Sequence, residues 1–166
     1  KDFIGGAGSV ACHARKLRAK VKFFTVLGND PTAKYVEKTL DQYDVESHLH
    51  YDVNRPTTLK ERFRVSNKTL LRVSHLRQHS ISIELSDEIY DQIENDIKNV
   101  DLVLFSDFNY GCLPQHLVDR IVALCMKTGV KMMADSQSSS QVGDISRFKN
   151  QALVTPTERE ARLGVG

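Results

Sequence analysis

Hydrophobic positions along the chain follow two patterns, short continuous apolar runs and longer stretches with helical spacing. The apolar runs predict buried strands, and the helical stretches between them predict helices that cover a sheet. The predicted strands are 21–27, 46–51, 102–105, 131–135 and 152–155. The predicted helices are 9–18, 31–43, one capped by Ser86, one from Pro114 to Gly129, and one from Glu158 onward. This alternation predicts an α/β fold with a mostly parallel sheet and helices on both faces.

One stretch, from Thr57 to Leu76, departs from this alternation. Its apolar and basic residues alternate as they do in a strand, and Asn67-Lys68 falls between the two runs as a possible turn. We predict a β-hairpin here, with one apolar and one basic face, which stands off the main sheet as a flap. The basic residues are Lys60, Arg62, Arg64, Lys68 and Arg72.

Composition narrows the class of protein. The 166 residues are enough for one domain, and 40% hydrophobic with 27% charged residues is ordinary for a soluble globular protein. A net charge of +2 is too small to predict a nucleic-acid or membrane partner. No apolar run approaches the roughly 18 residues of a membrane span, no signal peptide is visible, and the three cysteines form no C-x-x-C pair. We therefore expect a cytoplasmic protein with reduced thiols.

Polar residues follow several predicted strands, where ligands bind in parallel sheets. Asp107 and Asp135 come after two of these strands and could be helix caps or hard oxygen ligands for metal–phosphate chemistry. Thr157 and Glu160 follow the last strand and could be a cap with its partner or part of the same rim. The histidines complete no metal-ligand set, and no Walker A lysine loop or G-x-G-x-x-G is present.

Two further features allow both a functional and a plain structural interpretation. Gly5-Gly6 precedes a helix, so it is either a simple tight turn or a place where a ligand approaches the backbone. The cations of the hairpin suit phosphate groups, but a solvated charged face has the same pattern.

Six short motifs, in this order, resemble the PfkB (ribokinase-like) family of carbohydrate kinases. Within that family they are most similar to the heptose-7-phosphate kinase domain of ADP-heptose synthase. The motifs are Gly5-Gly6-Ala7-Gly8-Ser9-Val10-Ala11, Val26-Leu27-Gly28-Asn29-Asp30, Arg55-Pro56-Thr57-Thr58-Leu59-Lys60-Glu61-Arg62, Leu70-Leu71-Arg72, Ser106-Asp107-Phe108-Asn109-Tyr110-Gly111, and Thr155-Pro156-Thr157-Glu158-Arg159-Glu160.

The resemblance implies a ribokinase-like αβα sandwich with a small β lid, and transfer of the γ-phosphoryl group of ATP to a sugar or sugar-phosphate hydroxyl with Mg²⁺. The implied substrate-binding residues are Gly5, Gly6, Ser9, Lys60, Arg62, Arg72 and Asp107. The implied nucleotide- and phosphate-binding residues are Asp135, Thr157 and Glu160, of which Glu160 would hold Mg²⁺ through water. An exposed apolar lid is an edge that needs covering, which favours a homodimer through the lid.

The chain departs from the family pattern at several of these positions. Asn is usual where this chain has Ser9 and Thr157, and the heptose branch usually has Lys at Tyr110 and Asp-Pro-Lys at Asp135-Ser136-Gln137. These changes remove amide and cation contacts, so a catalytically degenerate relative that binds sugar or nucleotide, or serves assembly, stays an alternative. An unrelated α/β enzyme that binds a nucleotide or sugar nucleotide is a third hypothesis.

Two elements of the family pattern are expected outside residues 1–166. The opening strand with its sugar-binding Asp would precede Lys1, and the Gly-Ala-Gly-Asp element with the general base would follow Gly166. We therefore expect a truncated, partial kinase domain over residues 1–166, with the lid as an insertion at about 57–76. No catalytic residue is assigned within the chain, and residues 1–166 alone are predicted to be inactive.

Overall fold

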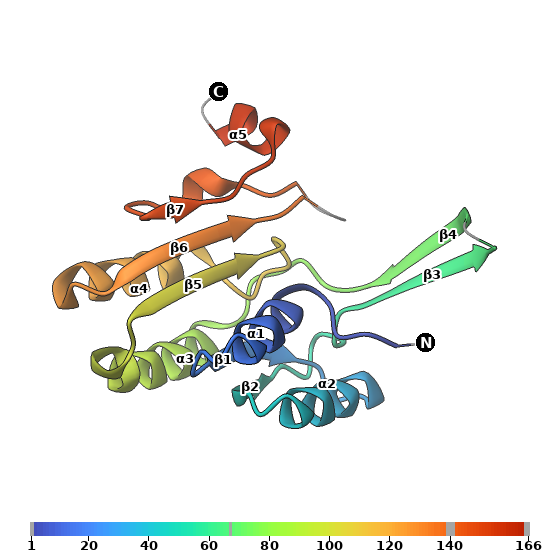
Figure 1. The fold of residues 1–166 in the computed structure, drawn as a ribbon, viewed down its shortest axis with the longest axis horizontal. Coiled ribbons are helices and arrows are strands. Elements are labelled where there is room, and N and C mark those ends of the chain that lie inside the picture. Colours follow the sequence, from blue (N-terminus) through green and yellow to red (C-terminus); the bar gives the residue numbers. More distant parts are fainter. Residues whose placement is uncertain (1, 67, 139–141, 165–166) are drawn as a thin grey trace. The chain divides into compact units, whose positions relative to one another are not determined.

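The computed structural model describes residues 2–66, 68–138 and 142–164 (Figure 1). The chain divides into two compact units, residues 1–77 and 78–166. The first unit contains α1 (Gly6–Lys16), β1 (Lys22–Leu27), α2 (Pro31–Gln42), β2 (Glu46–Tyr51), β3 (Leu59–Val65) and β4 (Lys68–His75). The second contains α3 (Ile83–Asp96), the 3₁₀ turn η1 (Ile97–Asn99), β5 (Leu102–Asp107), α4 (Gln115–Thr128), β6 (Lys131–Ser136), the 3₁₀ turn η2 (Ile145–Arg147), β7 (Leu153–Val154) and α5 (Glu158–Gly164).

In the first unit, β1 and β2 form a parallel pair in which Lys22 lies opposite Glu46. Pro31 occupies the first turn of α2, where its missing N–H costs nothing, and the Asp30 carboxylate caps that helix by accepting from the N–H of Ala33. The helices and strands close around a small core of buried residues: Ala11, Cys12, Leu40 and Val45. Burial of this apolar surface is what holds the two strands and two helices together.

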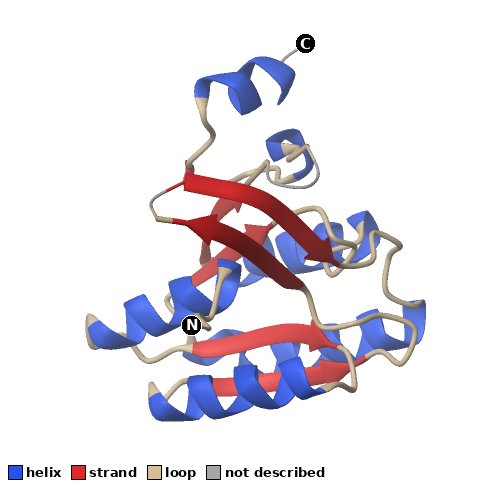
Figure 2. Cartoon of the chain, turned by 90° about the vertical axis from the view of Figure 1, so that its right-hand side faces the viewer, coloured by secondary structure: helices blue, strands red, loops and turns tan. Residues whose placement is uncertain are grey.

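The stretch predicted as a hairpin is one. β3 and β4 pair antiparallel as a two-stranded ribbon (Figure 2), with a register shift between Phe63 and Arg64. The predicted turn residue Asn67 lies outside the described residues. Phe63 lies opposite Leu71, and Arg62 lies opposite Arg72 on the other face. The predicted division into an apolar and a basic face is therefore confirmed for this part of the ribbon.

In the second unit, three parallel strands lie in the order β5-β6-β7. Helix α4 contacts β6 and α3, and its inner side chains Leu117, Val118 and Cys125 have no exposed surface. Gly129 ends α4 with φ 76, a left-handed conformation that glycine adopts without a side-chain clash. The α/β class and the mostly parallel pairing are confirmed.

Several predicted boundaries shift. The predicted helix cap Ser86 lies inside α3, which begins one turn earlier because Ser82 accepts from the N–H of Leu85 at 3.2 Å. Ser86 instead donates its hydroxyl to the Ser82 carbonyl at 2.8 Å. Helix α1 begins at Gly6 rather than Ser9, and it stops at Lys16 because Arg18 takes φ 71. Among the described helices, none is long and apolar enough to cross a membrane.

Candidate functional site

The end of β1 and the root of the hairpin form one junction within the first unit. A Cβ atom on Gly28 would lie 2.4 Å from the Arg55 carbonyl oxygen, so only glycine fits there. The N–H of Gly28 donates to the Thr57 hydroxyl at 2.9 Å, and the Thr57 N–H donates to the Asp30 carboxylate at 2.7 Å. Burial raises the pKa of the Asp30 carboxyl, but hydrogen bonds from the N–H groups of Thr57 and Ala33 lower it by more. The pKa of Asp30 is therefore below its usual range. The motif that includes Gly28 and Asp30 and the motif that includes Thr57 thus meet at the start of the hairpin.

The predicted sugar-binding glycines lie at the start of α1. Gly5 is extended and precedes the helix, while Gly6 takes φ 52, which glycine adopts freely. Both residues are exposed, so the start of α1 is open to solvent. Ser9, one turn further, lines an open groove of about 480 Å³ between α1 and α2. The structure therefore brings Gly5, Gly6 and Ser9 together at one helix end.

The predicted lid cations lie on the hairpin. Arg62 and Arg72 are directly opposite one another, and Lys60 lies two residues along the same face. Both arginines are exposed. Like charges directly opposite in a sheet destabilise it unless an anion lies between them. The hairpin therefore presents a local concentration of positive charge that suits an anionic ligand.

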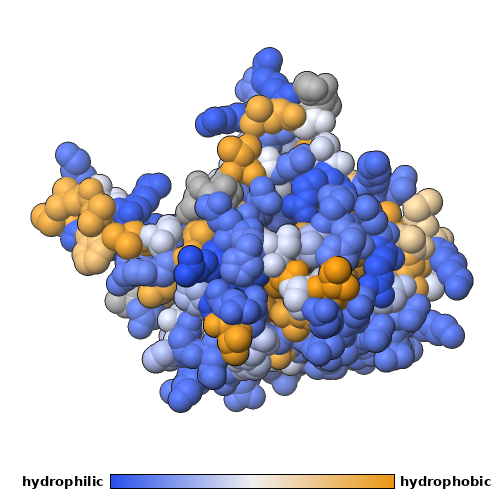
Figure 3. All heavy atoms as spheres, turned by 180° about the vertical axis from the view of Figure 1, so that it is seen from behind, coloured by the Kyte–Doolittle hydropathy of each residue, from blue (hydrophilic) through white to orange (hydrophobic). Residues whose placement is uncertain are grey.

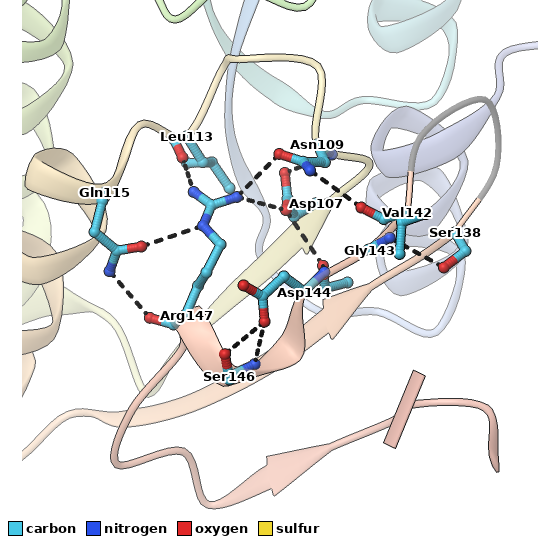
Figure 4. Close-up of polar contacts among 11 residues, drawn as sticks. Asp107, Asn109, Leu113, Gln115, Ser138, Val142, Gly143, Asp144, Ser146 and Arg147 are labelled. Carbon is cyan, nitrogen blue, oxygen red and sulfur yellow. Dashed lines mark hydrogen bonds and ion pairs between the residues drawn. The ribbon is translucent and has the colours of Figure 1, made fainter. Parts of the chain in front are cut away.

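In the second unit, Asp107 ends β5 with a side chain that is only 4% exposed. Its carboxylate accepts from the Asn109 N–H at 3.0 Å, the Ser136 hydroxyl at 3.3 Å and Nη1 of Arg147 at 3.2 Å (Figure 4). Asn109 has φ 56, which asparagine tolerates better than most residues. Asp107 is thus held in one orientation by three donors.

The second rim carboxylate, Asp135 of β6, is also satisfied locally. One oxygen accepts from the Thr155 hydroxyl at 2.9 Å, and the other accepts from the Gln137 side-chain amide at 2.6 Å. Gln137 and Ser136, two of the departures from the family pattern, therefore make contacts to the carboxylates Asp135 and Asp107. The structure places Asp107 and Asp135 on adjacent strands, where Ser106 pairs with Asp135.

Thr157 and Glu160 form a capping box at the start of α5. Glu160 accepts from the N–H and the hydroxyl of Thr157, each at 2.8 Å, and from the N–H of Ser138 after β6. These hydrogen bonds, first the Thr157 N–H and then the Ser138 N–H, lower the pKa of the buried Glu160 to about 2. The predicted cap is present, and it ties the segment after β6 to α5.

The Glu160 site fits Mg²⁺ only indirectly. A carboxylate offers about four lone-pair positions, and three donors already approach Glu160. The ionised group therefore keeps about one acceptor position, which suits a contact to a water of a hydrated Mg²⁺ rather than direct binding of the ion. Within residues 2–66, 68–138 and 142–164, no cluster of three His, Cys, Asp or Glu side chains could hold a metal ion.

The Glu160 contacts predict a pH effect. Its pKa is about 4.5 unfolded and about 2 folded, so its stabilising contribution is fully present above pH 4.5 and is lost as the pH falls towards 2. We expect Glu160→Gln to weaken the fall in stability between pH 4.5 and 2, because the variant has no carboxylate to protonate there. Urea unfolding across this range measures it. The matched control is Glu158→Gln, because Glu158 pairs with Arg162 in an exposed position. An equal effect of both variants would contradict the assignment.

Three contributors to this rim were not predicted: Arg147, Asn109 and the backbone of Ser138. Arg147 follows β6 by eleven residues and lies with Lys149 in a largely polar stretch, so nothing in its neighbourhood indicates a buried partner. Tyr110, where the heptose branch has Lys, is buried and stacks on Phe108 with ring centroids 6.1 Å apart. The segments that follow β5 and β6 therefore carry a positive charge on Arg147 and none on residue 110.

Comparison with known proteins identifies the family. The family model described as pfkB family carbohydrate kinase matches residues 1–166. The bifunctional protein HldE of Sulfurimonas denitrificans is 30% identical over 159 residues, covering 95% of this chain and 32% of that protein. HldE of Helicobacter pylori is 30% identical over 158 residues, covering 95% of this chain and 33% of that protein. The chain spans about a third of the length of these curated relatives.

Solved structures agree on the fold. A carbohydrate kinase from Agrobacterium tumefaciens superimposes with a TM-score of 0.73 at 17% identity, covering 98% of this chain and 52% of that one. Phosphofructokinase-2 from Escherichia coli superimposes with a TM-score of 0.67 at 18% identity, covering 97% of this chain and 51% of that one. The ribokinase-like fold predicted from the motifs is confirmed. With a family match over its whole length, the chain belongs to the pfkB family of carbohydrate kinases.

Proposed function

We propose that the full-length protein carrying this chain transfers the γ-phosphoryl group of ATP to a hydroxyl of a sugar or sugar phosphate. The observation that supports this most strongly is the match of the carbohydrate-kinase family to residues 1–166. The similarity of the motifs to the heptose-7-phosphate kinase domain makes heptose 7-phosphate the first substrate to test. Because the chain spans about a third of those relatives, the proposal concerns the whole protein.

On the substrate side, Gly5, Gly6 and Ser9 would contact the sugar. The start of α1 is exposed, and the backbone N–H groups of a first helical turn suit hydroxyl or anionic oxygens. On the lid, Lys60, Arg62 and Arg72 would hold a phosphate group already on the substrate, for which paired guanidinium groups are well suited. Asp107 would bind the substrate through its carboxylate, which is held in one orientation at the end of β5.

On the nucleotide side, we assign Asp135, Thr157 and Glu160. The ionised Glu160 would bind the hydration shell of Mg²⁺, and Mg²⁺ would neutralise charge on the phosphates of ATP. The capping contacts of Thr157 hold Glu160 in place, and Thr155 and Gln137 hold Asp135. Phosphoryl transfer depends mainly on such positioning and charge.

The lid arginines give a prediction about substrate class. In the full-length protein, replacing Arg62 and Arg72 together with Ala should raise KM for a phosphorylated sugar by about 10- to 100-fold, because one or more charge-assisted hydrogen bonds are lost. KM for ATP should stay unchanged. Lys68→Ala at the exposed end of β4 is the matched control. Steady-state kinetics measures both constants. If KM for the phosphorylated sugar is unchanged in the double variant, the lid arginines do not bind the substrate.

The alternative, a catalytically degenerate relative that binds ligands or serves assembly, has one supporting observation. Where the heptose branch has Lys, this chain has the buried Tyr110 and the Asp135-bound Gln137, so two cations are absent. Calorimetric titration with ATP and Mg²⁺ separates the two functions. Binding without phosphotransfer to any sugar favours the degenerate relative, whereas binding with transfer favours the kinase.

We further propose a homodimer formed through the hairpin. Its surface gathers exposed apolar side chains towards the tip (Figure 3, left): Phe63, Val65, Leu70 and Leu71, with Leu59 exposed at its other end. An exposed apolar ribbon with unpaired edges invites association, and a second copy offers a matching surface. Sedimentation of the full-length protein and of Phe63→Asp tests this, since a charged side chain should shift the dimer towards monomer. A cytoplasmic location, and inactivity of residues 1–166 alone, stay predictions.

A further inference from the structure

A single side chain, Arg147, gathers the segment that follows β5 (Figure 4). Its Nη1 lies 3.2 Å from the Asp107 carboxylate and 3.3 Å from the Asn109 side-chain oxygen. Its Nη2 donates to the Leu113 carbonyl, and its Nε donates to the Gln115 side-chain oxygen at 3.2 Å. One guanidinium therefore contacts four acceptors spread over residues 107–115.

Arg147 itself ends η2, in the segment that follows β6. The two segments follow neighbouring parallel strands, which is where ligands bind in such sheets. Neutral hydrogen bonds also join them: the Asn109 side-chain amide donates to the Val142 carbonyl at 3.1 Å, and the Gln137 N–H donates to the Asp107 carbonyl at 2.9 Å. The Arg147 guanidinium adds a charged contact to these neutral hydrogen bonds between the two segments.

The electrostatic balance also depends on Arg147. The Asp107 side chain is 4% exposed and that of Arg147 is 17% exposed, so each shields the other's charge in a largely dry place. Asp144, the nearest acid on the same segment, accepts instead from the N–H and hydroxyl of Ser146. A guanidinium has five N–H donors in a planar fork and can meet all four acceptors, whereas a lysine ammonium has only three donors on one nitrogen.

The Arg147 segment is tied to the end of β6 by two hydrogen bonds: the N–H of Gly143 donates to the Ser138 hydroxyl and the N–H of Asp144 donates to the Ser136 hydroxyl, each at 3.0 Å. We propose that Arg147 is a positioning residue, which through this segment fixes the substrate-side segment 107–111 relative to the nucleotide-side segment Asp135–Ser138. The inference rests on the proposed kinase function, because those two segments carry the residues assigned to sugar and nucleotide. Arg147 touches neither substrate itself and acts through Asp107 and Asn109. A shift of about 1 Å between reacting groups can cost about 100-fold in rate.

The test uses the full-length protein with Arg147→Met and Arg147→Lys. The matched control is Arg120→Met, because Arg120 is also an arginine of the second unit but pairs with the half-exposed Asp87. With Mg-ATP and heptose 7-phosphate, kcat should fall by about 100-fold in Arg147→Met, and both KM values should stay near those of the unchanged protein. Arg147→Lys should keep folding but recover only part of kcat. Folded Arg147→Met with an unchanged kcat overturns the proposal.

A second measurement separates this inference from the proposed function. If the unchanged protein phosphorylates no sugar, the kinase proposal fails, and amide hydrogen exchange then decides the role of Arg147. Faster exchange in peptides covering both 107–115 and 142–150 of Arg147→Met, with no change in Arg120→Met, supports the positioning role. Faster exchange confined to 142–150, or equal changes in both variants, overturns it.

Discussion

Asp107→Ala should lower the free energy of unfolding of the protein by about 3 kcal/mol. Its carboxylate is the acidic partner of Arg147, and the two side chains are 4% and 17% exposed. Removing one member of a largely buried ion pair leaves the other charge without its partner, which typically costs about 3–5 kcal/mol. The lower end applies here because the guanidinium keeps the acceptors of Asn109, Leu113 and Gln115. Urea unfolding followed by circular dichroism measures the change.

Asp87→Ala is the control for this prediction. Asp87 pairs with Arg120, but these side chains are 51% and 38% exposed, so the loss should be about 0–1 kcal/mol. Both substitutions truncate an aspartate that contacts an arginine within the second unit. They differ in burial and in the further donors of Asp107, the Asn109 N–H and the Ser136 hydroxyl. Equal losses from the two variants would mean that Asp107 contributes no more than a surface pair.

Gly111→Ala should cost about 2–4 kcal/mol of unfolding free energy. Gly111 has φ 80, and a Cβ atom there would lie 2.1 Å from the His79 carbonyl oxygen. The left-handed conformation alone costs alanine about 1 kcal/mol, and forcing the His79 backbone away adds about 1–3 kcal/mol. The Gly111 carbonyl also accepts from the Ile81 N–H at 3.0 Å, so the displacement would strain that bond. Thermal and urea unfolding of the variant measure the loss.

Gly129→Ala separates conformation from crowding. Gly129 has φ 76, close to that of Gly111, but nothing lies within 4 Å of its Cβ position. We expect it to lose only the conformational part, about 1 kcal/mol. If Gly129→Ala and Gly111→Ala are equally destabilising, the close approach of the 78–79 backbone to the segment after β5 carries no energetic weight.

The fold was largely predictable because its signals are local. Continuous apolar runs indicated β5 and β6, Gly129 marked the end of α4, and alternation of apolar and basic residues indicated the hairpin. The start of α3 could not be decided in this way, because Ser82 and Ser86 are one turn apart and either could cap a helix. Tertiary packing, which buries Ser86, decides it.

The candidate site was predictable only in part, since its residues make long-range contacts. Thr157 and Glu160 form the capping box that their spacing allows. Arg147 could not be found, because its acceptors lie 32 to 40 residues earlier in the chain. The same holds for the junction of Gly28 with Thr57, 29 residues apart, which explains why two separate motifs occur together.

The most direct test of the proposed function is phosphotransfer by the full-length protein. Radiolabelled ATP with Mg²⁺ would be offered to a panel of sugars and sugar phosphates that includes heptose 7-phosphate, and the labelled products would be separated. The account predicts Mg²⁺-dependent transfer of the γ-phosphoryl group to one member of the panel. Folded protein that binds ATP yet labels no sugar would contradict it.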